Sequence, residues 1–336
     1  MKGKKLLSLA VVLVFFLILS SFGYIQYLLT PIQQKAVDFI IQENQSIREL
    51  ARELQNKGVI RSATAFILYL RTFKLDKDIK AGDYHLEPVS SIKQLISSLQ
   101  KGQEKLIKYT IPEDYRIQKI AQKLAKEGLV DEKRFIELAT QKGTTFAFRY
   151  SDQVKEGNLE GFLFPNTYLI SKPTEEKVIE QMLLEFEKEV NDELLKGLAK
   201  TKLTLRQIII LASVIEKEAM VESEQALIAS VFYNRLAIDM PLQSCATVEF
   251  ALYQQGIFKD SYVLSLEELK TESPYNTYQH AGLPPGPICN PGLGAIKAAL
   301  NPAKTDFYYF AAKGDGSHAF GRTLDEHNAN VEKYIP

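Results

Sequence analysis

Two acidic residues follow an apolar segment in the middle of this chain. Residues 208–215 are apolar apart from one serine, and Glu216 and Glu218 come directly after them. On a helix, residues two apart point about 200° from each other, so these acids cannot act as a pair on one face. Glu218 is expected to share its face with bulky apolar side chains, namely Leu211, Val214, Ile215 and Val221.

An acid in such apolar surroundings could act as a general acid. Burial disfavours the ionised carboxylate and raises its pKa, so the group stays protonated near neutral pH. The alternative is a structural Glu218 paired with a cation such as Arg235 on the next helix. Glu216 faces small or flexible side chains, namely Ala212, Ser213, Ala219 and Met220, and is expected to be a structural or supporting acid.

Other kinds of chemistry find little support in the sequence. The four histidines lack the i, i+4 spacing of helical metal sites, so we expect no metal ion and no cofactor. Cys289 could in principle be a nucleophile with His280 or His318, but no activating setting surrounds it. Because 41 basic residues balance 41 acidic ones, nucleic acid is not an expected partner.

The N-terminus predicts a membrane anchor. Residues 6–34 carry no charge, and about 20 apolar residues suffice for a helix to span a bilayer. We assign the span to residues 6–30. The lysines in residues 1–5 favour a cytoplasmic N-terminus, which would place the rest of the chain outside. The alternative is a cleaved signal peptide, whose apolar region is normally shorter.

A weak repeat precedes the acidic segment. Residues 43–60 align with residues 113–130 at an offset of 70, and each copy is an amphipathic helix followed by Gly58 or Gly128. A strand-like run precedes each copy, and a further helix follows it, at 62–73 or 131–140. Residues 81–87 are expected to be a strand and 91–100 a helix. Small αβ modules of this kind suit binding.

The repeat does not continue after residue 150, and other patterns follow it. Thr204 is expected to cap the helix that carries the acids, and a second helix is expected at 224–238. A proline-rich loop follows residue 271, and 306–312 with 318–323 predict a hairpin. The expected fold class is therefore α+β, with an N-terminal transmembrane helix, small αβ modules and a mixed domain built around one buried helix.

Seven motifs in this order resemble one enzyme family. "LEGFLFPNTY", "LASVIEKEA", "VFYNRL", "PLQS", "SPYNTY", "GLPPGPICNPG" and "NPAKTDFYYF" are similar to those of the MltG/YceG family of endolytic murein transglycosylases. The resemblance implies a lyase that cuts the β-1,4 bond between N-acetylmuramic acid and N-acetylglucosamine within nascent glycan strands, leaving 1,6-anhydro ends. It also implies a role in terminating strand synthesis alongside the peptidoglycan polymerases.

The N-terminal run, the repeat and the resemblance together give the expected domains and site residues. We expect a cytoplasmic tail at 1–5, a single span at 6–30 in the cytoplasmic membrane, a LysM-like module at 31–104, a module related to it at 105–158 and a catalytic domain at 159–336 outside the cytoplasm. The catalytic acid falls on Glu218. The residues that would bind the sugar are Gln243, Ser244, Tyr275, Asn276, Thr277, Tyr278 and Asn290.

Two hypotheses concern the neighbourhood of this site. Cys245 and Cys289 both lie in motifs placed near the cleft, so a disulfide between them could tie two loops together. The alternative is two free thiols.

Two other functions stay open at this stage. One is a non-catalytic, membrane-anchored scaffold that binds the cell wall. The other is a hydrolytic muramidase that uses a second carboxylate, for which the candidates are Glu222, Asp239 and Glu249.

Overall fold

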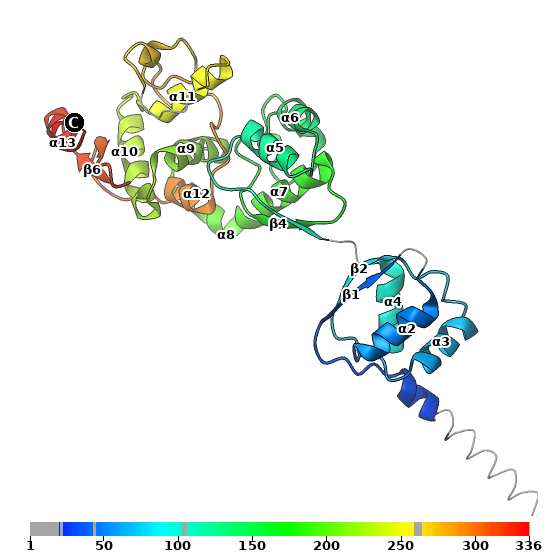
Figure 1. Cartoon of the computed structure of the whole chain (residues 1–336). Helices are drawn as coiled ribbons and strands as arrows, with labels where there is room; N and C mark the ends of the chain where they lie inside the picture. Colours follow the sequence, from blue (N-terminus) through cyan, green and yellow to red (C-terminus); the bar gives the residue numbers. More distant parts are fainter. Residues whose placement is uncertain (1–19, 21–22, 43–44, 103–105, 259–263, 336) are drawn as a thin grey trace, which may run out of the picture. The chain divides into compact units, whose positions relative to one another are not determined.

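The computed structural model describes residues 20, 23–42, 45–102, 106–258 and 264–335. These residues form two compact units, 1–107 and 108–336 (Figure 1). The predicted membrane span at 6–30 falls mostly outside the described residues. Among the helices that are described, none is long and apolar enough to cross a bilayer.

The first unit has the order strand, helix, helix, strand, helix, as the sequence predicts. Its elements are β1 (Val37–Ile41), α2 (Ile47–Asn56), α3 (Ala63–Thr72), β2 (Gly82–Leu86) and α4 (Ile92–Lys101). The strands β1 and β2 pair antiparallel, with Val37 opposite Leu86. One face of each helix is buried with them, including Leu50, Leu54 and Leu99.

The second unit begins with the second copy of the repeat. Its elements up to the central helix are β3 (Ile107–Thr110), α5 (Ile117–Lys126), α6 (Glu132–Gln141), η1 (Gly143–Thr145), η2 (Ser151–Gln153), β4 (Thr167–Ile170), α7 (Glu175–Glu189), α8 (Asp192–Leu195) and η3 (Lys196–Lys200). The strands β3 and β4 pair with each other. Nearly all of the segment predicted as a second module, 105–158, belongs to this unit.

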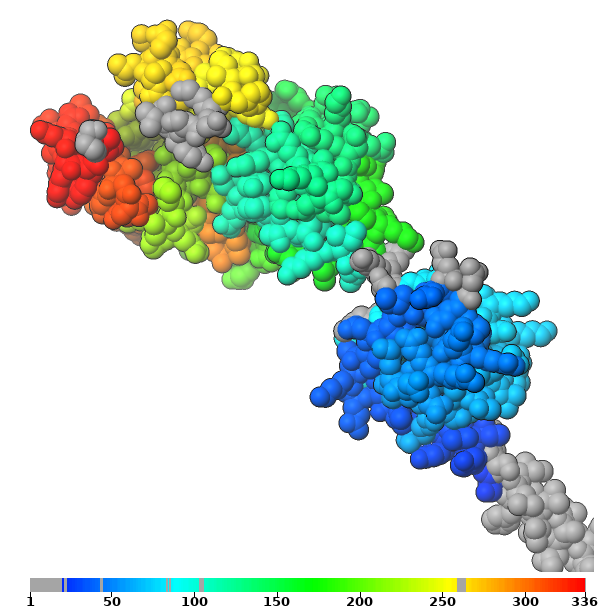
Figure 2. Space-filling view, in the orientation of Figure 1, coloured from blue at the N-terminus to red at the C-terminus, as the bar shows by residue number. Residues whose placement is uncertain are grey.

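The remaining elements begin with the buried central helix. They are α9 (Leu205–Glu218), η4 (Glu222–Glu224), α10 (Gln225–Ala237), α11 (Cys245–Gln254), η5 (Glu268–Lys270), α12 (Leu293–Leu300), β5 (Tyr309–Ala312), β6 (His318–Gly321) and α13 (Leu324–Tyr334). Within this unit the α5–α6 hairpin and the C-terminal segment of β6 and α13 lie at opposite ends (Figures 1 and 2). The strands β5 and β6 pair antiparallel, which confirms the predicted hairpin.

The two copies of the repeat end their first helices in the same way. The amide of Gly58 donates to the carbonyl of Gln55, and the amide of Gly128 donates to that of Ala125. Both glycines have a positive φ, of 70° and 72°, which glycine adopts without strain. The two copies, 70 residues apart, thus share the way their first helix ends as well as their apolar pattern.

The central helix α9 follows directly from its sequence. The hydroxyl of Thr204 accepts a hydrogen bond from the amide of Gln207, which confirms the predicted N-cap. All eight residues of 208–215 are buried, since α9 packs against α10, α11 and α12. The helix ends at Glu218, because Ala219 adopts an extended backbone with φ −91° and ψ 103°. The apolar run therefore fixes the position from which Glu218 projects.

Candidate active site

Glu218 is half-buried at the point where α9 leaves the core. The hydroxyl of Ser244 donates a hydrogen bond to its Oε1 atom. The backbone amide of Ala246 donates a second one. Both donors belong to the first turn of α11, where Ser244 is the N-cap residue but makes no cap bond within its own helix. The carboxylate of Glu218 therefore takes the place of a capping group at the positive end of α11.

The electrostatic surroundings of Glu218 pull its pKa in two directions. Burial raises the pKa above that of an ordinary glutamate and is the largest effect. The hydrogen bonds from Ser244 and Ala246 lower it, as do the charges of His318 and Lys217, but the net shift is upward. A carboxyl group of this kind stays protonated to higher pH than a solvated glutamate, which is what a general acid requires.

The sequence argument for Glu218 is only partly right. Its side chain meets the polar first turn of α11, and Val221 lies beyond the end of α9. Burial also raises the pKa of Glu216, to about 7. The prediction that only Glu218 has a raised pKa is therefore wrong. Met220, expected beside Glu216, is 82 % exposed. The reason is that the helix stops at residue 218, so that the predicted faces do not continue past it.

Glu216 points to a different part of the structure. Its Oε2 atom accepts a hydrogen bond from the amide of Gly292, at 3.0 Å, just before α12. Between the two acids, Lys217 forms an ion pair of 2.6 Å with Asp114. Glu216 therefore supports the junction of α9 and α12, in keeping with the predicted supporting role.

Thr277 and Arg235 hold Ser244 in place. The amide of Ser244 donates to the hydroxyl of Thr277 at 3.0 Å. The guanidinium of buried Arg235 donates to the carbonyls of Leu242 at 2.7 Å and Tyr308 at 2.6 Å. Arg235 thus anchors the segment before Ser244 through its backbone, and the predicted alternative of an ion pair between Arg235 and Glu218 is not formed among the described contacts.

Replacing Ser244 with alanine is expected to lower kcat about tenfold. The lost hydrogen bond stabilises the ionised form of Glu218 and fixes its rotamer, so the alkaline limb of the pH–rate profile should also move upward. The measurement is the rate of glycan cleavage between pH 5 and 9. Ser230→Ala, which also removes a hydrogen-bonded hydroxyl from this unit, is the matched control. Equal rates for wild type and Ser244→Ala would contradict this role.

The other residues predicted to bind sugar fall into two groups. Gln243 is exposed, and Tyr275 and Tyr278 are half-buried, so these three can face a ligand. Asn276 is fully buried and its amide donates to two backbone carbonyls, at 3.0 and 2.8 Å. Thr277 is also buried, between the first turn of α11 and its own loop. In this structure the last two hold the loop that presents the tyrosines.

Asn290 is a buried junction of three chain segments. Its Oδ1 atom accepts hydrogen bonds from the amides of Gly161 and Leu163, both at 2.9 Å. Its Nδ2 atom donates to the carbonyl of Tyr115 at 2.9 Å and to the carboxyl group of Glu160 at 2.7 Å. With 1 % of its surface exposed, Asn290 is placed to hold the loops together and does not face solvent.

The predicted disulfide is absent. Cys245 and Cys289 are both free thiols. The thiol of Cys289 donates to the carbonyl of Ser213 at 3.3 Å, while the sulfur of Cys245 lies 3.2 Å from the hydroxyl of Tyr278. The two cysteines sit in motifs of one domain, but they point to different partners. Proximity of motifs in a domain does not establish the close approach that a disulfide needs.

Thiol titration should report both groups. In denaturant without reductant we expect two reactive thiols, since neither cysteine is bridged. In the native protein Cys289 should not react, because it is fully buried and burial raises its pKa, while half-buried Cys245 should react slowly. Ellman's reagent measures both states. Fewer than two reactive thiols in the unfolded chain would mean that Cys245 and Cys289 form a disulfide after all.

Of the candidate second carboxylates, Glu249 lies within electrostatic reach of Glu218. It is half-buried on α11, burial raises its pKa, and the charge of Glu218 raises it further. The attractive charges of Lys217 and Arg116 act in the opposite direction. Analysis of the products tests whether Glu249 acts as the second carboxylate of a hydrolase.

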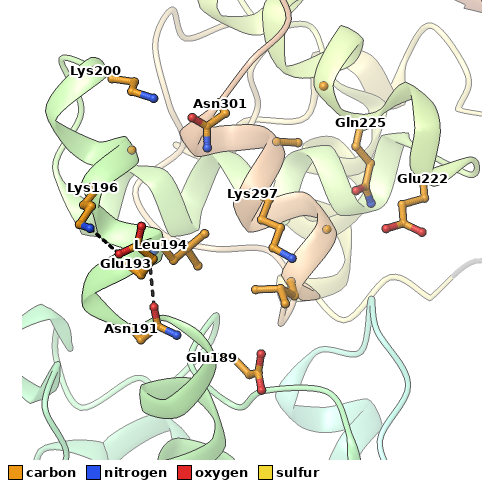
Figure 3. A pocket seen from close by; sticks show the side chains of 15 residues that line it. Glu189, Asn191, Glu193, Leu194, Lys196, Lys200, Glu222, Gln225, Lys297 and Asn301 are labelled. Carbon is orange, nitrogen blue, oxygen red and sulfur yellow. Dashed lines mark hydrogen bonds and ion pairs between the residues drawn. The ribbon is translucent and has the colours of Figure 1, made fainter.

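A cavity of about 1010 Å³ lies elsewhere in this unit, and neither Glu218 nor Ser244 lines it. Its lining comes from α7, α8, η3, η4, α10 and α12, with Glu222 and Gln225 at one end and Lys200 at the other (Figure 3). The third candidate second carboxylate, Asp239, is not among the residues that line it, whereas Glu222 is. Among the described residues, no cluster of three or more His, Cys, Asp or Glu side chains could hold a metal ion.

Comparison with known proteins decides the family. The model of the YceG-like family matches residues 39–333. The chain belongs to the YceG-like family.

Similar proteins agree with this assignment. An endolytic murein transglycosylase of Bacillus subtilis (strain 168) is 35 % identical over 332 residues, which cover 94 % of this chain and 90 % of that protein. An endolytic murein transglycosylase of Streptococcus pneumoniae (strain R6) is 33 % identical, covering 96 % of this chain and 64 % of that protein. A crystal structure of a YceG-like protein from Listeria monocytogenes matches with a TM-score of 0.59 and 32 % identity, covering 88 % of this chain and 99 % of that one.

Three groups that act on Glu218 or on the buried loop junction are not predicted by the sequence. They are the amide of Ala246, the buried carboxyl group of Glu160, which binds Asn290, and His318, which the sequence offers only as a partner for a cysteine nucleophile. Glu160 lies in "LEGF", a motif that could have directed attention to it. Backbone donors and contacts between distant residues leave no periodic pattern in a sequence. No motif therefore pointed to Ala246 or His318.

Proposed function

We propose that this protein is a membrane-anchored endolytic lytic transglycosylase, a lyase that cleaves peptidoglycan glycan strands with Glu218 as its acid and base. The observation that carries the proposal is the setting of Glu218, a half-buried carboxyl group of raised pKa held by Ser244 and Ala246. It stands in a chain whose relatives are named endolytic murein transglycosylases.

One carboxyl group can carry both proton transfers of this reaction. Protonated Glu218 donates its proton to the glycosidic oxygen between N-acetylmuramic acid and N-acetylglucosamine, and the C1–O bond breaks. The C6 hydroxyl of the muramic acid then attacks C1 and gives its proton to the carboxylate of Glu218. Glu218 ends in its starting state, and the product carries a 1,6-anhydro ring. No water is consumed, in contrast to the two-carboxylate hydrolases.

Three exposed or half-buried side chains of the predicted set are proposed to contact a sugar. Tyr275 and Tyr278 each offer an apolar ring and a hydroxyl group, a combination that suits a pyranose. Gln243 supplies an exposed amide. Thr277, Asn276 and Asn290 act behind them by holding the loops.

Further parts of the proposal concern location and partners. Residues 6–30 span the cytoplasmic membrane once with the N-terminus inside, the first unit is a LysM-like module that binds the glycan, and the enzyme ends glycan synthesis beside the polymerases. The uncharged N-terminal run and the βααβ order of the first unit support this. Fractionation of the full chain against one starting at residue 31 tests the anchor, because only the first should stay with membranes.

Mass spectrometry of digested peptidoglycan tests the reaction. New 1,6-anhydro-N-acetylmuramic acid ends, produced by cleavage inside the strands, support the lyase. Reducing ends would identify a hydrolytic muramidase, and glycan binding without any product would identify the scaffold.

A further inference from the structure

Gln243, the residue before Ser244, has an unusual backbone conformation. Its φ angle is 50°, in the left-handed region that residues with a Cβ atom rarely adopt. Such a conformation costs free energy and persists only where the surrounding structure fixes it. The residues on either side, Leu242 and Ser244, each have 1 % of their surface exposed, whereas Gln243 is exposed. The left-handed residue therefore joins two residues that are packed inside the protein.

Hydrogen bonds fix the backbone before and after this residue. The carbonyl that precedes it accepts from the guanidinium of Arg235 at 2.7 Å, and the amide of Gln243 donates to the carbonyl of Thr277 at 3.0 Å. The amide of Ser244 donates to the hydroxyl of Thr277 at 3.0 Å. The carbonyl of Ser244 accepts from the hydroxyl of Thr247 at 2.7 Å. The backbone is thus held on both sides of Gln243, and the left-handed conformation connects the two held parts.

The conformation of Gln243 sets the direction in which Ser244 points. Because the amide of Gln243 is fixed, a change of its φ angle rotates the chain that follows. A move from 50° to an ordinary value near −60° is a rotation of about 110°. Ser244 is the next residue, and its hydroxyl donates to Glu218. Such a rotation would carry this hydroxyl away from Glu218 or break the bonds that hold the backbone of Ser244.

The side chain of Gln243 has no part in holding this conformation. In the part of the chain that the structure describes, its amide group has no hydrogen-bond partner. The bonds that fix the residue are made by its backbone and by the backbone of its two neighbours. The backbone and the side chain of Gln243 can therefore have separate roles, and substitutions can distinguish them.

We propose that Gln243 is a positioning residue through its backbone, and that its left-handed conformation directs the hydroxyl of Ser244 to Glu218 while its side chain stays free for the glycan. The inference rests on the proposed function, because it gives Gln243 a part in that reaction through Ser244. Residue types that adopt the left-handed region readily should therefore preserve the catalytic step. Residue types that avoid this region should slow it, whatever contact the side chain makes.

The test compares two replacements of Gln243 in the full-length protein. Gln243→Val should lower kcat about tenfold, as Ser244→Ala does, because a β-branched residue strongly disfavours the left-handed region and the bond to Glu218 is lost. Gln243→Gly should keep kcat within about twofold, because glycine adopts this conformation without strain. Its KM should rise, since the side chain that faces the glycan is missing. The release of anhydro ends, measured at increasing glycan concentration, gives both constants.

A double variant shows whether the effect passes through Ser244. In the Ser244→Ala background, Gln243→Val should lower kcat no further, because the hydrogen bond that it disturbs is already missing. A second loss of about tenfold in that background would overturn the inference. Equal losses of kcat in Gln243→Gly and Gln243→Val would also overturn it, since the side chain would then be responsible. A wild-type kcat in Gln243→Val would have the same meaning.

Lys172→Val is the control for strain itself. Lys172 is exposed, has a φ angle of 46° and lies between β4 and α7 of the same unit. Its replacement should lower stability as Gln243→Val does, but leave kcat of the folded protein unchanged. An equal loss of kcat would mean that strain alone slows the reaction, and would overturn the inference.

Two further outcomes are distinguishable. If Gln243→Val does not fold, Gln243→Ala takes its place, because its smaller side chain is less disfavoured in the left-handed region. A kcat equal to that of Gln243→Gly would then overturn the inference. If the wild-type protein itself yields no anhydro ends, the proposed function fails, which is a different result.

Discussion

Replacement of Glu218 with glutamine should reduce the release of anhydro ends by about 10³-fold, the scale of a lost general acid. The carboxamide cannot donate a proton to the glycosidic oxygen or accept one from the C6 hydroxyl. It keeps an oxygen that can accept from Ser244 and Ala246, so the cap of α11 is retained. Because burial disfavours the carboxylate, the free energy of unfolding should fall by no more than about 1 kcal/mol.

The matched variant is Glu216→Gln, two residues earlier on the same helix. Glu216 also has a raised pKa, but its hydrogen bond goes to Gly292 at the start of α12. The Glu216→Gln variant should lose no more than about tenfold in rate. That loss would come from a weaker junction between α9 and α12. Product analysis by mass spectrometry and thermal unfolding measure both variants. Near-normal turnover in Glu218→Gln, or an equal loss in both, would contradict the assignment of the acid.

Replacement of Asn290 with alanine should cost about 3 to 5 kcal/mol of unfolding free energy. The change leaves the amides of Gly161 and Leu163 buried without acceptors, and each such group costs about 1–3 kcal/mol. It also removes the donor to Tyr115 and Glu160. The loops of "LEGF" and "CNPG" would lose the side chain that joins them. Chemical denaturation measures the change.

Asn301→Ala is the control for this variant. Asn301 follows α12, lines the open cavity and is exposed, so its loss should change stability by less than about 0.5 kcal/mol. If Asn290→Ala were as stable as wild type but bound glycan poorly, Asn290 would instead contact the sugar, as its motif first indicated.

The sequence predicted those parts of the fold that depend on local patterns. The eight buried residues before Glu216 and the capping hydroxyl of Thr204 predicted α9, and both are observed. Repeated apolar spacing and a glycine predicted the paired helix ends at Gly58 and Gly128. Such features arise within one or two turns of chain, where neighbouring residues alone decide the conformation.

The parts that sequence reasoning could not reach depend on contacts across the chain. Ser244 lies 26 residues beyond Glu218 and Thr277 a further 33 residues away, so no spacing in the sequence indicates that they meet. Motif membership also did not separate residues that face the ligand from those that hold a loop, as Asn276 shows. The predicted disulfide failed for the same reason, since direction and distance of side chains are set by tertiary packing.

The two copies of the repeat differ in what completes their first helix. In the first copy Ser46 and Glu49 cap α2 from within the helix's own first turn. In the second copy Arg116 supplies no side-chain cap to α5, and the amide of Ile117 is bonded instead by Glu160. The first copy thus completes its helix with its own residues and could be exchanged or deleted as a unit. The other depends on Glu160 of the following segment for its first turn, so it cannot be separated from the rest of the second unit.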